Sequence, residues 1–234
     1  MAAAMAPAVF GNVPEQKPRN WSSHIYGGAT MRAGNTEESA YRYGGLFECG
    51  REGVYRGMMR FDGRYRKTNR VVSESRNEVG SELRRMFGKK WFAAGTATGL
   101  HDDAREIRYR IIGGPAAGRY LYDTDVVRLD VSSGFVYLHE TTDVTRRDTV
   151  DWRAAQQFRW KITETLECWT NSELLVNLDE TDNYRATIRA GIDNRITKHF
   201  SLVVSILNEY DNLPDNEELK KNDFEVTTGV RYTF

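Results

Sequence analysis

The residues of this chain that could do chemistry are arginines and glutamates that recur at even spacing. Arg56, Arg60 and Arg64 lie four residues apart, and Arg185 and Arg189 repeat that spacing near the C-terminus. An even spacing puts such side chains on one face of a β-strand. Rows of arginine could line a small polar or anion-favouring pore. The alternative, which the density of both charges favours, is that they interlock with carboxylates in an ion-pair network, because charges taken out of water must be paired.

The segments that carry these charges alternate between apolar and polar residues. In 223–234, Phe224, Val226, Val230, Tyr232 and Phe234 alternate with polar or small residues, which is the two-residue period of a strand with one apolar face. No apolar run approaches the length of a membrane-spanning helix. Twelve strand segments are expected, at about 21–33, 38–49, 53–65, 72–86, 90–100, 105–118, 126–138, 150–162, 166–177, 183–194, 199–209 and 223–234.

The connections between these segments also alternate. Those after even-numbered segments are short (50–52, 87–89, 163–165 and 195–198), whereas those after odd-numbered segments include the longest (66–71, 139–149 and 210–222). An even strand number with this asymmetry is typical of outer-membrane barrels, whose short turns are periplasmic. The sequence therefore predicts an all-β fold: a single up-and-down antiparallel transmembrane β-barrel of about 12 strands, with short periplasmic turns and longer extracellular loops.

The barrel is expected to occupy residues 21–234, after a flexible N-terminal lead at 1–20. Ala4-Met5-Ala6 resembles the end of a signal peptide whose basic start is missing. Within the barrel, Pro115 predicts a bulge or a bend, because proline cannot donate to the ladder of hydrogen bonds.

The polar faces of the strands define the candidate site, the lumen of the barrel. We expect it to be lined, as a pore or as an ion-pair network, by Arg56, Arg60, Arg64, Glu74, Glu78, Glu82, Arg108, Arg110, Arg153, Arg159, Glu173, Arg185, Arg189, Glu225 and Arg231.

The same residues favour a protein without catalytic, cofactor or metal chemistry. Ser133 and His139 share a strand face but lie roughly 20 Å apart, too far for a nucleophile and its base, and no Gly-x-Ser-x-Gly motif occurs. Cys49 and Cys168 fall on distant segments and are expected to be unpaired. With 33 basic and 33 acidic residues, the net charge is zero, and no nucleic-acid partner is indicated.

Two other classes of protein stay open at this point. One is an outer-membrane hydrolase acting on lipid, which would need a Ser/His/acid set assembled across strands. The other is a soluble lipocalin-like barrel, which would bind a small ligand in an apolar cavity and present polar faces outward.

Three parts of the chain carry a likeness to a known family: Trp21 to Gly34-Asn35-Thr36, Gly113 to Tyr122, and the hairpins that end in Thr227-Thr228-Gly229-Val230-Arg231-Tyr232-Thr233-Phe234. Over about residues 20–234 the chain resembles a domain family of unknown function whose members are labelled salt-induced outer membrane proteins. The resemblance implies a β-barrel in the outer membrane of Gram-negative bacteria and supplies no catalytic residue or ligand.

The last strand also resembles the closing strand of outer-membrane barrels, in which Tyr232 and Phe234 would form the assembly signal. We therefore expect a structural or narrow porin-like outer-membrane protein with a charge-lined lumen, linked to envelope or osmotic stress. Its partners would be outer-membrane lipid, lipopolysaccharide and the barrel-assembly machinery.

Overall fold

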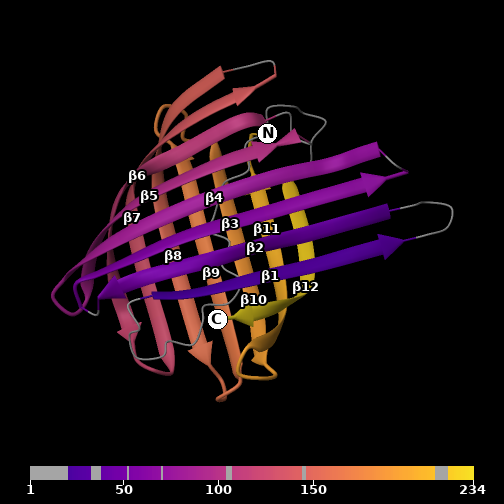
Figure 1. Ribbon diagram of the computed structural model, residues 1–234. Helices are drawn as coiled ribbons and strands as arrows, with labels where there is room; N and C mark the ends of the chain where they lie inside the picture. The colour runs from indigo at the N-terminus through magenta and orange to yellow at the C-terminus, as the bar shows by residue number, and fades with distance from the viewer. Residues whose placement is uncertain are drawn as a thin grey trace.

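The computed structural model describes residues 21–32, 38–51, 53–69, 71–103, 107–143, 146–213 and 221–234. Within these ranges the chain forms twelve β-strands (Figure 1). Their bounds are β1 Trp21–Arg32, β2 Glu38–Arg51, β3 Tyr55–Thr68, β4 Val71–Phe87, β5 Trp91–Asp102, β6 Ile107–Asp123, β7 Val127–Thr142, β8 Arg146–Lys161, β9 Leu166–Asn177, β10 Tyr184–Arg195, β11 Phe200–Asp211 and β12 Asn222–Thr233. The lead at 1–20 and the Gly34-Asn35-Thr36 motif lie outside the described residues.

The strands form one closed barrel in which each pairs antiparallel with its neighbours in sequence, and β1 pairs with β12. In Figure 1, β1 to β5 cross one wall of this barrel and β9 to β12 the opposite wall. The predicted class, strand number and up-and-down topology are therefore confirmed. No helix in the described part of the chain is long and apolar enough to cross a membrane.

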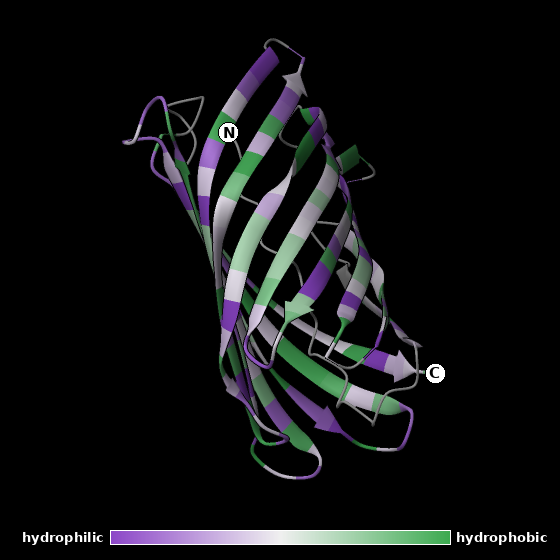
Figure 2. Cartoon of the chain, turned by 90° about the vertical axis from the view of Figure 1, so that its left-hand side faces the viewer, coloured by the Kyte–Doolittle hydropathy of each residue, from purple (hydrophilic) through white to green (hydrophobic). Residues whose placement is uncertain are grey.

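The two-residue period sorts side chains between the outside and the inside of the barrel. Along β11, Phe200, Leu202 and Val204 are exposed on the outer surface, whereas Ser201 and Val203 are buried inside. Figure 2 shows hydrophobic and hydrophilic residues alternating along the strands in the same way. The large apolar side chains therefore face outward, which excludes the lipocalin-like arrangement of polar outer faces around an apolar cavity.

Exposed aromatic side chains collect at both ends of the outer apolar surface. The end with the short turns after even-numbered strands, here called the turn end, carries Trp21, Tyr55, Phe87, Trp91, Tyr122, Trp160, Phe200 and Phe234. The opposite end, here called the loop end, carries Tyr41, Tyr43, Tyr109 and Tyr137. On β11, Phe200 and Tyr210 are separated by about 33 Å along the strand, or about 25 Å along the axis of a barrel with strands tilted by about 40°. That height matches the apolar band of outer-membrane barrels.

Two of the long loops predicted from the sequence are mostly β-strand, so these two predictions are wrong. β7 and β8 continue through most of 139–149, with His139 opposite Asp148 and Glu140 opposite Arg147. Opposite charges that face each other across two strands stabilise a ladder rather than end it, and His139 Nδ1 lies 2.6 Å from Asp148 Oδ1. The strands β3 and β4 likewise cover most of 66–71. The connection at 178–183, in contrast, contains no strand residue.

Pro115 interrupts a ladder without shifting its register. Gly113 pairs with Tyr137 and Ala116 with Gly134, and the positions between them on β6 are paired with β5 but not with β7. The expected bulge is therefore absent there. The two strands approach closely instead, since a Cβ on Gly114 would meet the Phe135 carbonyl oxygen at 2.0 Å. Glycine is required at this position because any side chain would force β6 and β7 apart.

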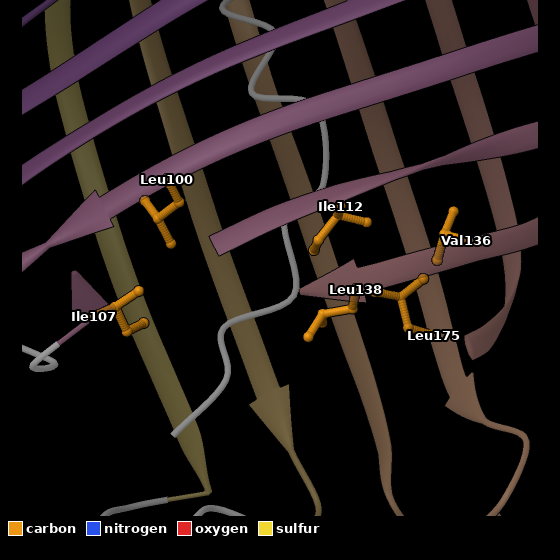
Figure 3. Packing of buried hydrophobic residues seen from close by; sticks show 6 residues of the cluster. All are labelled: Leu100, Ile107, Ile112, Val136, Leu138 and Leu175. Carbon is orange, nitrogen blue, oxygen red and sulfur yellow. The ribbon is translucent and has the colours of Figure 1, made fainter. Parts of the chain in front are cut away.

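The interior also contains apolar side chains that the sequence did not indicate. One cluster joins Leu100, Ile107, Ile112, Val136, Leu138 and Leu175 (Figure 3), and a second joins Phe92, Ala94, Ala116 and Tyr120. Both are centred on β5 to β7, so the charged part of the interior lies mostly against the other strands. The barrel is therefore filled by an apolar sector and a charged sector.

The assigned outer face generates a depth-dependent prediction on a single strand. Ile192→Arg, within the apolar band of β10, should lower the free energy of unfolding by about 2–4 kcal/mol, because lipid excludes the charge. Ile196→Arg is the matched control: Ile196 is exposed in the turn after β10, at the membrane interface, where the cost should be about 0–1 kcal/mol. Urea unfolding in lipid vesicles measures both. Equal losses would contradict the assigned membrane band.

Candidate functional site

The candidate site is the charged sector of the interior, and most of its predicted residues lie there. Fully buried inside the barrel are Arg60, Glu78, Arg110, Arg153, Arg159, Glu173, Arg185, Arg189 and Arg231. Partly buried are Arg56, Arg64, Glu74, Glu82 and Glu225. The strands place them by simple alternation, as in β9, where every second residue from Glu167 to Asn177 is buried.

Arg108 departs from this arrangement. Its side chain is 68% exposed and pairs with Asp143 at 2.6 Å, at the loop end of the barrel. The cause is a register shift of β6 against β7 between Ile107 and Tyr109. Because of that shift, Arg108 loses the inward orientation that its spacing from Arg110 predicts.

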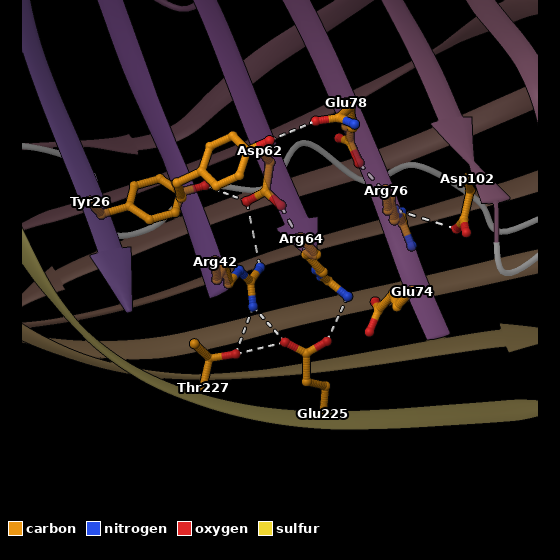
Figure 4. A network of polar contacts seen from close by, with 12 residues as sticks. Tyr26, Arg42, Asp62, Arg64, Glu74, Arg76, Glu78, Asp102, Glu225 and Thr227 are labelled. Carbon is orange, nitrogen blue, oxygen red and sulfur yellow. Dashed lines mark hydrogen bonds and ion pairs between the residues drawn. The ribbon is translucent and has the colours of Figure 1, made fainter. Parts of the chain in front are cut away.

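At one side of the interior, two arginines converge on one carboxylate. Arg42 on β2 donates to Glu225 Oε1 at 2.5 Å and to Thr227 Oγ1 at 2.6 Å, while Arg64 on β3 donates to Glu225 Oε2 at 2.6 Å (Figure 4). Asp62 lies between the same two arginines, at 3.6 and 3.8 Å. The cluster thus joins β2 and β3 to β12 across β1.

A second cluster crosses the interior from one wall to the other. Glu78 is held by Arg60 and by Arg76, the latter at 3.4 Å. Arg76 on β4 also lies 3.8 Å from Glu209 on β11 and 3.9 Å from Asp102 on β5. The strands β3, β2, β1 and β12 separate β4 from β11 around the barrel. The Arg76–Glu209 pair therefore bridges the lumen.

A third cluster surrounds Arg84 towards the turn end. Arg84 is bonded to Glu82, lies 3.2 Å from Asp130 on β7 and from the Tyr120 hydroxyl on β6, and covers the Phe92 ring at 4.4 Å. This arginine satisfies its charge and packs its guanidinium plane on an apolar surface. It therefore joins the charged sector of the interior to the apolar one.

Several other buried charges form pairs between nearby strands. Arg153 donates to Glu173 at 2.5 Å, and Arg110 is bonded to Glu140. Arg185 lies 3.6 Å from Asp211, and Arg159 lies 3.6 Å from Glu167. Arg231 on β12 pairs with Asp193 on β10, with β11 between them. These ion pairs therefore connect the strands to one another from inside the barrel.

Sequence reasoning missed several partners in these clusters. Arg76 and Arg84 have the same parity as Glu78 and Glu82 on one strand, so alternation alone could have added them to the site. Glu140 fell in a segment expected to be a loop. Asp130, Asp193 and Glu209 also face inward, but their partners depend on the curvature of the barrel and have no signal in the local sequence.

The other candidate chemistry does not assemble in the described part of the chain. His139 is bonded to Asp148, but within the described ranges no serine or threonine hydroxyl is hydrogen-bonded to its ring. Ser133 accepts a hydrogen bond from the Trp152 indole instead. Cys49 and Cys168 are both free thiols. Across the described ranges, no three His, Cys, Asp or Glu side chains are grouped to hold a metal ion.

Comparisons with known proteins agree with this architecture. A family model described as "Protein of unknown function, DUF481" matches residues 27–234. No curated protein sequence matches the chain.

Among solved structures, the NanC porin has a TM-score of 0.56 at 8% identity, over 90% of this chain and 98% of the porin. The translocator domain of the autotransporter NalP from Neisseria meningitidis has a TM-score of 0.51 at 10% identity, over 92% of this chain and 87% of the domain. The KdgM porin has a TM-score of 0.51 at 8% identity, over 92% of this chain and 99% of the porin. At such identities the likeness shows the fold, that of an outer-membrane β-barrel.

The buried pairs generate a stability prediction. Glu78→Gln should lower the free energy of unfolding by about 3–5 kcal/mol, because it removes the carboxylate that holds the buried Arg60, whereas Arg76 keeps Asp102 and Glu209. Asp143→Asn is the control, since it breaks the exposed pair with Arg108 and should cost about 0–1 kcal/mol. Thermal or urea unfolding in one detergent compares the two variants. A loss at Glu78 no larger than that at Asp143 would show that the lumen is fully hydrated.

Proposed function

We propose that this chain, which belongs to the DUF481 family of proteins of unknown function, is a narrow channel of the bacterial outer membrane. In this proposal the lumen is a polar path kept narrow by paired charges. The outward apolar band, the aromatic side chains at both its ends and the fold of outer-membrane barrels support membrane placement.

The observation that carries the proposal is the contact between Arg76 and Glu209 across the lumen. A lumen wide enough for a large hydrated solute would keep β4 and β11 too far apart for their side chains to meet. In the proposed channel, water and small ions move around these bridging side chains. The channel should therefore conduct weakly.

The balance of charge favours weak selectivity. Among the described residues, the fully buried charges are nine arginines and eleven carboxylates. Rings of arginine favour anions and rings of carboxylate favour cations, and here the two are interleaved and nearly equal. The anion preference that the arginine rows suggested is therefore weakened by aspartates and glutamates on facing strands. One of the similar structures is a KdgM porin in complex with an oligogalacturonate, but such an elongated acidic ligand would have to displace the pairs described here.

We also propose that Tyr232 and Phe234 are read by the machinery that inserts the barrel. Both are on or beside the strand that closes it, and the Phe234 ring packs edge-on against Tyr232 at 5.0 Å on the outer surface. A link to envelope or osmotic stress follows from the family resemblance alone and stays a prediction.

The channel proposal predicts the effect of removing the bridge. Wild-type protein in planar bilayers should show small conductance, and Glu209→Ala should raise it, because the lumen loses its contact between opposite walls. Arg76 keeps Glu78 and Asp102 as partners, so the variant should still fold. The reversal potential should move towards anion preference, since a carboxylate is lost.

Glu164→Ala, in the exposed turn after β8, is the matched control and should leave both quantities unchanged. A large wild-type conductance, or a Glu209→Ala conductance equal to that of the control, would contradict the proposed barrier.

The assembly proposal is tested by two phenylalanines that share one neighbour. Phe200 also packs edge-on against Tyr232, at 5.1 Å, so Phe200→Ala and Phe234→Ala should lose similar packing, at most about 1.5–3 kcal/mol each. Only Phe234→Ala should lower the amount inserted in cells, measured by surface labelling. Refolding into detergent should be alike for the two variants. Equal insertion in cells would remove the special role of Phe234.

A further inference from the structure

The seam between β1 and β12 is paired by backbone hydrogen bonds over only part of its length. Within the described residues its register runs from His24 opposite Thr233 to Gly27 opposite Val230 and ends there. β1 pairs with β2 from Trp21 to Arg32, and β12 pairs with β11 from Tyr232 to Asn222. The two strands therefore continue towards the loop end without pairing with each other.

This unpaired part lies within the height of the outer apolar band. The other edge of β12 pairs with β11, where Gly229 lies opposite Val203 and Val226 opposite Ile206. These positions on β11 lie between Phe200 and Tyr210, the two residues that mark the height of the apolar band. Unpaired backbone in contact with hydrocarbon costs several kcal/mol per group and is tolerated only against protein or a water-filled cavity. The seam is thus a place where the lumen and the lipid phase can meet.

The opening is a wedge whose narrow end is bordered by glycines. At its narrow end lies a small hollow whose lining includes Gly27, Gly28, Gly229, Val203 and Val230. A Cβ on Gly28 would still lie 3.6 Å from the Thr228 carbonyl oxygen, so the strands are close at this point. An added β-strand would need about 9.6 Å between β1 and β12 along its whole length. The wedge suits a single narrow chain better than a peptide strand.

Side chains rather than backbone hold the two sides of the wedge together. Arg42 and Arg64 reach past β1 to the carboxylate of Glu225, and Arg42 also reaches Thr227 (Figure 4). The side chain of Glu225 is 35% exposed, so it can be replaced at the arginines by another anion. Two guanidinium groups on one acceptor form the arrangement that binds phosphate or carboxylate groups.

We propose that the loop-end half of the β1–β12 seam is a lateral portal for an anionic amphiphile with one apolar chain. Its head group displaces Glu225 from Arg42 and Arg64, and its chain leaves the barrel into lipid through the wider part of the wedge, on the loop-end side of Gly28 and Thr228. The proposal rests on the membrane placement given under the proposed function, but not on ion conduction.

The test uses a disulfide that locks the seam. Ala29→Cys and Thr228→Cys, which would face each other if the ladder continued, are combined in a background with Cys49→Ser and Cys168→Ser. The control lock joins β10 to β11 through Ile192→Cys and Val204→Cys, a pair already opposite each other. The probe is dodecyl phosphate, added to protein in dodecyl maltoside and measured as a retained adduct by native mass spectrometry.

The unlocked protein should retain dodecyl phosphate, and inorganic phosphate should compete at least tenfold less well. The Ala29–Thr228 lock should abolish retention until reductant is added, while the control lock should leave it unchanged. Arg42→Gln should weaken binding about tenfold or more, as expected for loss of charged hydrogen bonds, whereas Arg66→Gln, at a more exposed arginine, should not.

Retention by the locked protein, equal competition by inorganic phosphate, or no retention at all would each overturn the portal. A seam filled by an extended peptide, detected as a co-purifying chain that blocks formation of the lock, would overturn it as well. Bilayer conductance should be the same for locked and unlocked protein. A wild-type barrel without conductance would therefore refute the channel while leaving the adduct measurements to decide the portal.

Discussion

A backbone amide or carbonyl inside a bilayer has no water to bond with, so its partner must come from the protein. The architecture described here follows from that constraint. Twelve strands form a closed ring, so that each strand has a hydrogen-bonded neighbour on both sides. The alternation of residues along each strand then directs apolar side chains to lipid and polar ones inward. A longer interruption than the one at Pro115 is the loop-end half of the β1–β12 seam, where the ladder stops at Gly27 and Val230.

Closing the ring creates a second constraint, because it encloses many charges in a narrow space. A buried ion costs several kcal/mol unless a partner and hydrogen bonds compensate it. The interior meets this with clusters as well as separate pairs: Arg76 contacts Glu78, Asp102 and Glu209, and Arg84 contacts Glu82 and Asp130. Sharing partners in this way reduces the effect of losing any one contact. It also fixes the distance between opposite walls, which couples the electrostatics of the lumen to its width.

The sequence predicted the features that depend on neighbours along the chain. The two-residue period identified the strands and both faces, including the exposed Phe224, Val226 and Val230 of β12. It failed where tertiary context decides the outcome. Residues 139–149 are charged as a loop would be, yet their charges face each other across β7 and β8 and prolong the hairpin. A register shift turned Arg108 outward. The pair between Arg76 and Glu209 depends on the curvature of the whole ring, which no local pattern contains.

The contacts across the lumen also bear on the order in which the barrel can form. Arg42, Arg64 and Arg76 belong to the N-terminal hairpins, while Glu209 and Glu225 belong to the last two strands. Their sequence separation is large, so the entropy of closing a long loop must be overcome before they can meet. Until that moment these arginines have only the carboxylates of the N-terminal strands as partners, such as Asp62 and Glu78. Neutralisation of the interior is therefore completed only when the barrel closes, and an incomplete barrel would be marked by exposed positive charge along its inner edge.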